Sequence, residues 1–469
     1  MRVQLFRRAL LVAVTAAVLA PAAAAAGPRM WVGFQDDPSF RWTSDRSETL
    51  DFAASADATV IRTTVYWYKV APRRPQNAAD PFDPAYRFED LDEMIRGAQQ
   101  RGIEVLLTVW GTPKWAGPAN NQLPRTLADY TKFTRALASR YSGGYAGYPY
   151  VRFYSIWNEP NRGLFLFPQF DSKGHSVAPR NYAKLVRAGY AGIKAANRKA
   201  LVAVGETASN GRDRKVTRKG LQDTHSPGKF AELLGKVRPR IKFDAWAHHP
   251  YPTSPSMKPT QKMRWPNVSL ASLPKFEVSL DKWFAKRKTP LWITEYGHET
   301  KPDKRGISFT KQRQYLAQAF SIARKDQRVQ MFVWFILTDR STVKWESGLV
   351  TAGGSEKPAF ATFASLARAV DARNAIVEVG GFEPVVRFSM LPMAYYAPPG
   401  SGVGVAWELQ QGSEILATDV PVVPLETDGW VSLRLPAFTP TRGLTYTLII
   451  RANNEAGVKL TRVLTLIGR

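Results

Sequence analysis

The chain has 469 residues, a formal net charge of +26 at pH 7 and no cysteine. This length allows two or three domains, and the lack of cysteine excludes disulfides, cysteine nucleophiles, zinc–thiolate sites and iron–sulfur clusters. The positive charge favours acidic partners such as anionic glycans and envelope polymers. We expect no nucleic-acid partner, because the basic residues are spread along the chain and are not gathered in one arm.

The first residues follow the plan of a secretory signal peptide. Three arginines within the first eight residues precede an apolar run from Ala9 to Leu19, and an alanine-rich A-x-A cleavage pattern ends before Gly27. We therefore predict a signal peptide over residues 1–26 and a protein that is secreted, extracellular or attached to the cell surface. The apolar run is short for a membrane span, and an uncleaved N-terminal anchor is the alternative. We expect no membrane span after cleavage.

Eight short apolar runs alternate with helical patterns between Met30 and Val370. The runs are nearly continuously hydrophobic, which is typical of parallel strands that are covered on both faces. They occupy residues 30–34, 59–65, 103–109, 151–157, 201–204, 243–247, 291–293 and 331–336. Eight strand–helix units predict an α/β fold, a closed (β/α)₈ barrel, over residues 27–373. An open doubly wound sheet is the alternative, but no G-x-G-x-x-G follows a strand.

The pattern changes after Arg373, where short alternating runs are separated by turns. The clearest runs occupy residues 384–389, 404–409, 429–435, 446–452 and 459–466. This pattern predicts an all-β sandwich domain of the immunoglobulin or fibronectin type over residues 374–469. We favour a structural role for this domain.

Two glutamates directly follow apolar strands of the predicted barrel. Glu159 follows the fourth run and Glu295 the seventh, and active sites of such barrels lie at the carboxyl ends of the strands. Glycoside hydrolysis needs one carboxylic acid to protonate the leaving oxygen and one carboxylate on the other side of the bond. A surface ion pair would explain either glutamate alone, but not two at the same end of one barrel.

The motifs around these glutamates resemble those of clan A glycoside hydrolases. Asn-Glu-Pro at 158–160, within the run 153–161, resembles the strand-four signature, and Thr-Glu-Tyr-Gly at 294–297 resembles the strand-seven signature. Positions 62, 249–251 and 334 match the clan's residues on strands two, six and eight. The third run ends in Trp110, where family 5 commonly has histidine, so family 39 stays open beside family 5.

The resemblance implies a retaining mechanism through a covalent glycosyl-enzyme, acting on a β-type glycosidic bond or its configurational equivalent. It implies that Glu159 is the acid/base and that Glu295 is the nucleophile. It also implies that Asn158 hydrogen-bonds the sugar 2-hydroxyl and that Arg62 and Tyr251 hold Glu295 ionised and oriented.

Three more side chains are candidates for the sugar-binding site. The resemblance implies that His249 lines the pocket and that Trp334 forms the floor of the subsite on which the reaction takes place. Trp110 is aromatic and ends a strand, and both stacking on a sugar ring and core filling are open for it.

We predict no metal and no cofactor. His248 and His249 are neighbours on a strand and point to opposite faces, so both cannot easily bind one ion. A basic segment, residues 212–219, follows the fifth run, and Lys301, Lys304 and Arg305 follow the seventh. A solvated loop is the simpler interpretation of this charge, and recruitment of anionic glycans is the alternative.

The sequence thus predicts a secreted, monomeric retaining glycosidase that hydrolyses β-linked oligo- or polysaccharides. A transglycosidase would use the same residues and differ only in whether a sugar or water accepts the intermediate. A non-catalytic carbohydrate-binding protein on the same barrel is the other alternative, against which the two glutamates argue.

Overall fold

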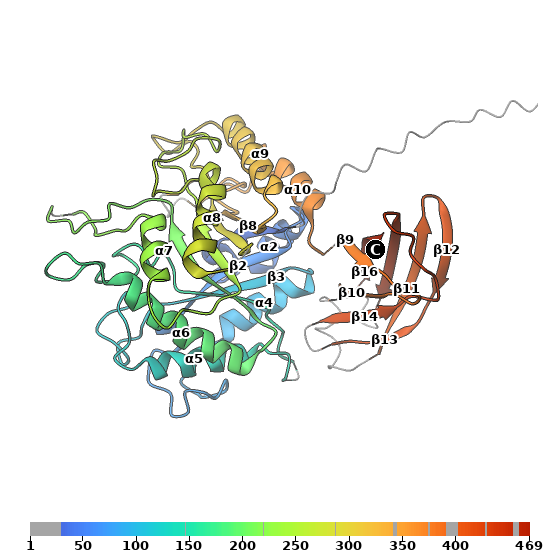
Figure 1. Cartoon of the computed structure of the whole chain (residues 1–469), viewed down its shortest axis with the longest axis horizontal. Helices are drawn as coiled ribbons and strands as arrows, with labels where there is room; N and C mark the ends of the chain where they lie inside the picture. Colours follow the sequence, from blue (N-terminus) through green and yellow to red (C-terminus); the bar gives the residue numbers. More distant parts are fainter. Residues whose placement is uncertain are drawn as a thin grey trace, which may run out of the picture.

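The protein is described by a computed structural model (Figure 1). The described residues are 30–145, 147–218, 220–286, 288–340, 345–373, 376–390, 402–426, 429–453 and 459–469. The predicted signal peptide, residues 1–26, lies outside them. Among the described helices, none combines the length and the apolar composition that crossing a membrane requires.

Eight parallel strands close into a barrel in chain order, so the predicted (β/α)₈ fold is confirmed. The strands are β1 (Trp31–Gln35), β2 (Val60–Tyr66), β3 (Glu104–Trp110), β4 (Phe153–Ile156), β5 (Leu201–Ala208), β6 (Ala245–His249), β7 (Leu291–Tyr296) and β8 (Val329–Phe335). Closure comes from β1 pairing with β8, with Phe34 beside Trp334. Every predicted apolar run overlaps one strand, because strands that are covered on both faces must be apolar on both.

Helices cover the outside of the barrel (Figure 1). They are α1 (Asp37–Phe40), α2 (Arg46–Ser55), α3 (Trp67–Val70), α4 (Glu89–Gln100), α5 (Leu127–Arg140), α6 (Ala178–Ala196), α7 (Pro227–Gly235), the 3₁₀ turn η1 (Leu270–Ser272), α8 (Leu273–Phe284), α9 (Phe309–Lys325) and α10 (Ala359–Val370). α4 shows how the sequence specifies them. Leu91, Met94, Ile95 and Ala98 lie at helical spacing and are all fully buried, and acidic residues occupy the first turn, where the helix dipole favours negative charge.

The barrel interior has an apolar layer at the amino ends of the strands. Strand residues alternate between the interior and the helix-covered face, and the inward-facing residues of this layer form a cluster of their own. Phe153 lies at its centre, with edge-to-face contacts at centroid distances of 5.4 Å to both Trp31 and Trp292. This layer fills the barrel interior at the amino ends of the strands, so a cavity inside the barrel opens at the carboxyl ends.

The C-terminal part is all-β and has its own hydrophobic core, as predicted for a sandwich. Its strands are β9 (Ile376–Val379), β10 (Val385–Ser389), β11 (Gly402–Gln411), β12 (Glu414–Asp419), β13 (Val422–Pro424), β14 (Trp430–Arg434), β15 (Thr445–Asn453) and β16 (Lys459–Gly468). β10 pairs with β14, and the longer sheet has the order β12-β11-β15-β16-β9, with β13 on β11. The sequence patterns did not reveal β9, β12 and β13, since they are short or, for β12, largely exposed.

The C-terminal sheets lie beside the barrel (Figure 1) and meet it through polar contacts. Lys199 forms an ion pair of 3.5 Å with Glu426, and the Arg152 guanidinium lies 4.3 Å from the centre of the Trp430 ring. Arg152 and Lys199 precede β4 and β5 in the chain. The contact is therefore at the amino ends of the strands, away from the carboxyl ends.

Candidate active site

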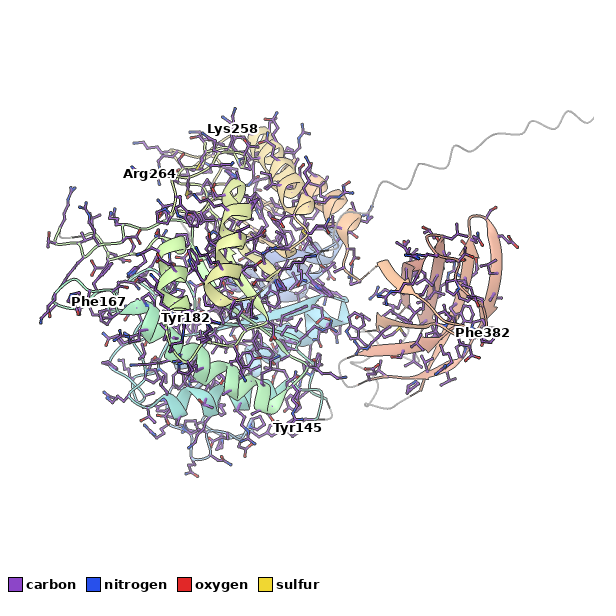
Figure 2. All side chains as sticks on the ribbon, in the orientation of Figure 1. Tyr145, Phe167, Tyr182, Lys258, Arg264 and Phe382 are labelled. Atoms are coloured by element: carbon purple, nitrogen blue, oxygen red, sulfur yellow. The ribbon has the colours of Figure 1, made fainter. Side chains whose placement is uncertain are left out.

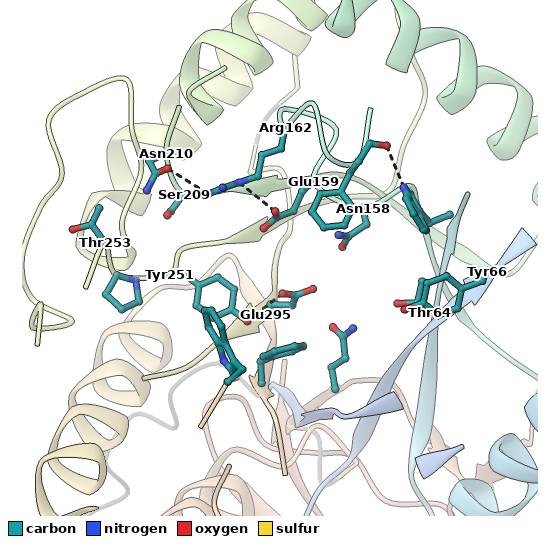
Figure 3. Close-up of a pocket in the computed structure, with 16 residues that line it drawn as sticks. Thr64, Tyr66, Asn158, Glu159, Arg162, Ser209, Asn210, Tyr251, Thr253 and Glu295 are labelled. Carbon is teal, nitrogen blue, oxygen red and sulfur yellow. Dashed lines mark hydrogen bonds and ion pairs between the residues drawn. The ribbon is translucent and has the colours of Figure 1, made fainter. Parts of the chain in front are cut away.

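A cavity of about 590 Å³ opens at the carboxyl ends of the barrel strands (Figure 3). Its walls come from the last residues of the strands and from the loops that follow them. The lining residues are Gln35, Thr64, Tyr66, Trp110, Asn158, Glu159, Arg162, Phe165, Ser209, Asn210, Tyr251, Pro252, Thr253, Glu295, Phe335 and Trp345. Trp110, Asn158, Glu159, Tyr251 and Glu295 are therefore brought together as the sequence predicts.

Glu159 and Glu295 face each other across this cavity (Figure 3). Glu159 lies in the turn after β4, where Trp157 and Glu159 both have positive φ, 68° and 35°. One carboxylate oxygen of each glutamate and one ring nitrogen of His249 all lie within 4.8 Å of one another. Carboxyl groups are about 5–5.5 Å apart in retaining glycosidases and about 6.5–9.5 Å apart in inverting ones. The close approach is thus the arrangement that direct attack by one carboxylate requires.

Glu295 is held by two donors. Arg62 Nη1 donates a hydrogen bond of 2.7 Å to Oε1, and the Tyr251 hydroxyl donates one of 3.1 Å to Oε2. Burial and the neighbouring charge of Glu295 raise the pKa of Tyr251 well above its ordinary value, so the hydroxyl keeps its proton and remains a donor. These contacts fix the orientation of the Glu295 carboxylate.

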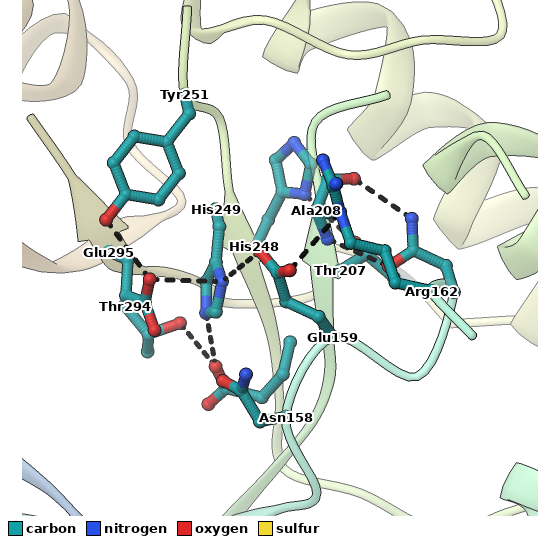
Figure 4. Close-up of polar contacts among 12 residues, drawn as sticks. Asn158, Glu159, Arg162, Thr207, Ala208, His248, His249, Tyr251, Thr294 and Glu295 are labelled. Atoms are coloured by element: carbon teal, nitrogen blue, oxygen red, sulfur yellow. Dashed lines mark hydrogen bonds and ion pairs between the residues drawn. The ribbon is translucent and has the colours of Figure 1, made fainter. Parts of the chain in front are cut away.

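Glu159 is bound on both oxygens (Figure 4). His249 Nδ1 lies 3.2 Å from Oε1, and Arg162 Nε lies 3.2 Å from Oε2. Burial opposes ionisation, but the hydrogen bond from His249 and the charge of Arg162 lower the pKa of Glu159 below its ordinary value. For His249, burial opposes the charge, while Glu295, Glu159 and Glu206 raise its pKa to about 9. One proton is therefore held in the Glu159–His249 pair.

Asn158 lies between these groups and the cavity. Its Oδ1 accepts a hydrogen bond of 2.9 Å from Arg62 Nη2. Because the carbonyl oxygen is used in this way, the amide nitrogen is the atom that Asn158 can offer to a ligand in the cavity. Arg62 itself does not line the cavity and acts from below, through its bonds to Asn158 and Glu295.

Aromatic rings form much of the remaining wall. Trp110 ends β3, and its indole nitrogen donates to the carbonyl of Phe165 at 3.2 Å, which fixes the ring in the cavity lining. Phe335 and Trp345 line the cavity as well, with their ring centres 5.9 Å apart in an edge-to-face contact. Flat apolar rings beside paired carboxylates suit a ligand with apolar faces and polar edges, such as a sugar.

The family model for Cellulase (glycosyl hydrolase family 5) matches residues 25–338. The chain belongs to glycosyl hydrolase family 5. As a family 5 chain it is a glycosidase, and its clan acts with retention of configuration. The match decides between the two families that the motifs left open, although Trp110 stands where family 5 commonly has histidine. No curated protein sequence matches the chain.

Solved structures share the fold at low sequence identity. A family 39 glycoside hydrolase from Bacteroides cellulosilyticus WH2 is 19% identical with a TM-score of 0.53, covering 87% of this chain and 79% of that one. A glucosidase from Croceicoccus marinus is 14% identical with a TM-score of 0.55, covering 88% and 94%. The GH5_18 protein of Streptomyces cattleya, in complex with GlcNAc, is 15% identical with a TM-score of 0.52, covering 75% and 85%.

Trp334 does not form the floor of the site in this family 5 chain, and that prediction is wrong. The residue is fully buried and belongs to the core between barrel and helices, where its indole nitrogen donates to the Ser347 carbonyl at 2.8 Å. The reason is the two-residue period of the strand. Met331 and Val333 face the barrel interior, so the next inward residue is Phe335, which does line the cavity.

His249 lies behind the carboxylates and not on the cavity wall. It is fully buried, with Nδ1 toward Glu159 and Nε2 2.7 Å from Glu206. The expectation that His249 lines the pocket is therefore wrong, since His249 contacts the carboxylates from the layer beneath the cavity wall. His248 points to the opposite face, as predicted, where its ring contacts Phe276.

Glu206 lies near the end of the fifth strand, but the sequence interpretation gave it no role in the site. It lies just beyond the predicted fifth run and bonds both Arg62 and His249, so its place after an apolar strand was the available signal. Arg162 and Trp345 were also missed, because they lie in loops, where no sequence pattern predicts the direction in which a side chain points.

The family 5 site also contains a group of potential metal ligands, formed by Glu159, His249 and Glu295. His249 Nδ1 lies 3.2 Å from a Glu159 oxygen and 3.6 Å from a Glu295 oxygen. These ion pairs account for the cluster by themselves.

The basic segment 212–219 stays outside the cavity wall in the part of the chain that the structure describes. Asp213 accepts hydrogen bonds from the amide and hydroxyl of Ser226, each at 2.7 Å, and Lys215 reaches the carbonyl of Asp171 at 3.1 Å. Residues 212–218 form a largely exposed loop that the contacts of Asp213 hold in place, in agreement with the simpler interpretation of the charge.

Proposed function

We propose that this family 5 chain is a secreted enzyme that hydrolyses O-glycosidic bonds in β-linked oligo- or polysaccharides by double displacement. In this proposal Glu295 is the nucleophile and Glu159 is the acid/base. The observation that carries it is the pair of carboxylates in one cavity, with oxygens within 4.8 Å and with different partners.

The partners assign the two roles. Glu295 accepts hydrogen bonds from Arg62 and Tyr251, and a carboxylate that two donors hold in one orientation is positioned for attack at the anomeric carbon. Glu159 shares a proton with His249, and a group beside a proton source suits protonation of the leaving oxygen. Once the glycosyl-enzyme has formed, the same Glu159 accepts a proton from the attacking water, which releases the sugar with net retention.

The substrate class is supported by the walls of the cavity. The Asn158 amide nitrogen is free to bond a sugar hydroxyl near the reacting carbon, as the resemblance implies for the 2-hydroxyl. Trp110, Phe335 and Trp345 provide rings for the apolar faces of a sugar. Among the described residues that line the cavity, Arg162 is the basic one, and it already pairs with Glu159, so neutral glycans are favoured over acidic ones.

Secretion rests on the N-terminal sequence alone. A positive start, an apolar run and an A-x-A pattern before Gly27 are what a signal peptidase recognises. Expression of the full chain with N-terminal sequencing of the extracellular protein tests this part, and a mature protein that begins at Gly27 is expected.

A panel of aryl β- and α-glycosides, together with neutral and uronic-acid polysaccharides, tests the function. We expect hydrolysis in the β-series, with the β-anomer as the first product in ¹H NMR. Hydrolysis that gives the α-anomer first, or activity confined to α-glucoside-type substrates, would overturn the proposal.

A further inference from the structure

Glu206 is a fully buried carboxylate in β5 that the proposed double displacement does not use. It is the extra residue of a β-bulge, since the pairing with β6 shifts between Gly205 and Thr207. Its φ is +44°, a left-handed conformation that is unfavourable for a residue with a side chain. Bulges re-aim side chains beside active sites, and this one turns Glu206 into the barrel.

Two neighbouring residues, Gly205 and Tyr182, stabilise the bulge. Gly205 has a φ of +100°, and a Cβ at this position would lie 2.5 Å from the Trp246 ring and 2.7 Å from the Ala247 carbonyl oxygen. The Gly205 amide donates to the hydroxyl of Tyr182 at 2.9 Å, and Tyr182 is a fully buried residue of α6, labelled in Figure 2. Glycine and tyrosine thus keep the backbone in the shape that presents Glu206.

One oxygen of Glu206 receives three donors. Oε2 accepts from His249 Nε2 at 2.7 Å, from Thr294 Oγ1 at 2.8 Å and from Arg62 Nη2 at 3.1 Å. Burial opposes ionisation, but Arg62 and His249 lower the pKa of Glu206 to about 2. Glu206 is therefore charged at neutral and mildly acidic pH.

His249 connects this buried charge to the acid/base. Its Nε2 bonds Glu206, while its Nδ1 lies 3.2 Å from Glu159 and 3.6 Å from Glu295 (Figure 4). Because a carboxylate accepts from Nε2, that nitrogen carries a proton in both charge states of the ring. Titratable and charged groups surround the His249 ring from several strands. Glu159 follows β4, Glu206 lies on β5, His248 and Tyr251 lie on and after β6, and Glu295 lies on β7. Arg62 on β2 acts on the ring through its bonds to Glu206 and Glu295.

We propose that Glu206 is a positioning residue of the acid/base apparatus, which holds His249 by its Nε2–H so that Nδ1 stores and returns the proton of Glu159. The inference rests on the proposed function, because it gives Glu159 its proton for the acid step. It goes beyond the two-carboxylate mechanism by adding a third carboxylate that never touches the substrate.

The proton balance closes over one turnover. Before the first step the N–H bond at Nδ1 breaks and an O–H bond forms on Glu159, which leaves a neutral imidazole with Nε2–H on Glu206. Glu159 then transfers this proton to the departing glycosidic oxygen as Glu295 bonds the anomeric carbon. In the second step water attacks that carbon, its proton passes to Glu159 and then to Nδ1, and the Glu295–carbon bond breaks.

Glu206→Gln tests the inference, since glutamine keeps the size and an accepting oxygen but removes the charge. We expect the pKa of His249, followed by imidazole ¹⁵N NMR, to fall from about 9 by about 1–3 units. We expect kcat/KM to fall roughly 100-fold for glycosides with poor leaving groups and much less for activated aryl glycosides, with the basic limb of the pH profile moved to lower pH. Glu104→Gln is the matched control, because Glu104 is a buried carboxylate at the start of β3, in the opposite half of the barrel.

An unchanged His249 titration, or equal losses on both kinds of substrate, would overturn the inference. If Glu206→Gln does not fold, Glu206→Asp replaces it. The aspartate keeps the charge but is too short to reach Nε2 of His249. We therefore expect a smaller fall in the pKa of His249 and a smaller loss of kcat/KM for glycosides with poor leaving groups, and the absence of both counts against the inference. A wild-type enzyme inactive on every glycoside would overturn the proposed function instead, while the NMR comparison of His249 still decides the role of Glu206.

Discussion

At the amino ends of the strands the barrel interior is mainly apolar, whereas at the carboxyl ends it holds several buried charges. Phe153 and Trp292 pack edge to face in the lower layer, while Arg62, Glu206 and His249 are fully buried in the upper layer. The lower layer gains stability from removing apolar surface from water. The upper layer must hold charges out of water, which costs stability unless each is paired.

Three residues with strained backbone lie in the charged half, although Asp57, Ala285 and Lys288, in loops that precede strands, have positive φ as well. Trp157, Glu159 and Glu206 all have positive φ and all lie at or near the carboxyl ends of β4 and β5. Such conformations are unfavourable for residues with side chains, and they cluster at functional sites. The contrast between the two halves shows that the same eight strands serve two purposes. Their amino-terminal halves contribute mainly to folding stability, and their carboxyl ends carry the chemistry.

The largest expected effect is on activity, from the charged half. Glu159→Gln should lower kcat/KM by about 10²–10⁴-fold on substrates with poor leaving groups, because no proton reaches the departing oxygen, and it should abolish the basic limb of the pH profile. Activated aryl glycosides should lose much less in the first step. Steady-state kinetics on both substrate types checks this, and equal losses would argue against an acid role.

The next effect is on stability, from the apolar half. Trp292→Ala should lower the free energy of unfolding by about 3–5 kcal/mol, since it removes a buried ring and leaves a cavity. The kcat of the folded variant should stay within about twofold of wild type, because the site lies in the other half. Denaturant unfolding and kinetics at low temperature check this, with Trp292→Phe as a milder control. A large loss of kcat in folded Trp292→Ala would contradict the claim that the apolar half contributes to stability and not to the chemistry.

The two neighbouring histidines of β6 sharpen the comparison across a single strand. Burial, with the contacts of Val268 and Thr207 opposing it, lowers the pKa of His248 to about 4, whereas the three carboxylates raise the pKa of His249 to about 9 despite its burial. The stability from neutral His248 is present above about pH 6.5 and is lost as the pH falls toward 4. That from charged His249 is present below about pH 6.5 and is lost as the pH rises through 9. NMR titration should separate the two rings, and similar pKa values would contradict this account.

The smallest effect is expected from removal of the C-terminal sheets. A chain ending at Arg373 keeps the whole barrel core, which includes Val370, and omits a separate core that begins at Val379. The truncation breaks the ion pair between Lys199 and Glu426, which is largely exposed, and such pairs contribute about 1 kcal/mol or less. We expect a folded barrel with nearly unchanged kcat on small substrates. An insoluble barrel would show that the sheets supply essential packing, and a soluble inactive one that they contribute to the site.

Much of this division could be predicted from the sequence. Each barrel strand was visible as an apolar run, and Glu159 and Glu295 were visible because motifs surround them. Sequence patterns could not show which way an individual side chain points. Trp334 and Phe335 are both apolar and adjacent, so only the pairing of β8 decides which ring faces the cavity. Glu206 reaches the site only through a bulge, a local break in the alternation that a regular strand would follow.

The most direct test of the central assignment is the configuration of the product that Glu295→Ala forms with azide from an aryl β-glycoside that wild type hydrolyses. Removal of the nucleophile should lower turnover by roughly 10⁴-fold or more and leave room for azide to attack from the face that Glu295 occupied. We predict recovery of activity and an α-glycosyl azide by ¹H NMR. Near-normal activity without azide, or a β-glycosyl azide, would contradict Glu295 as the nucleophile and the double displacement with it.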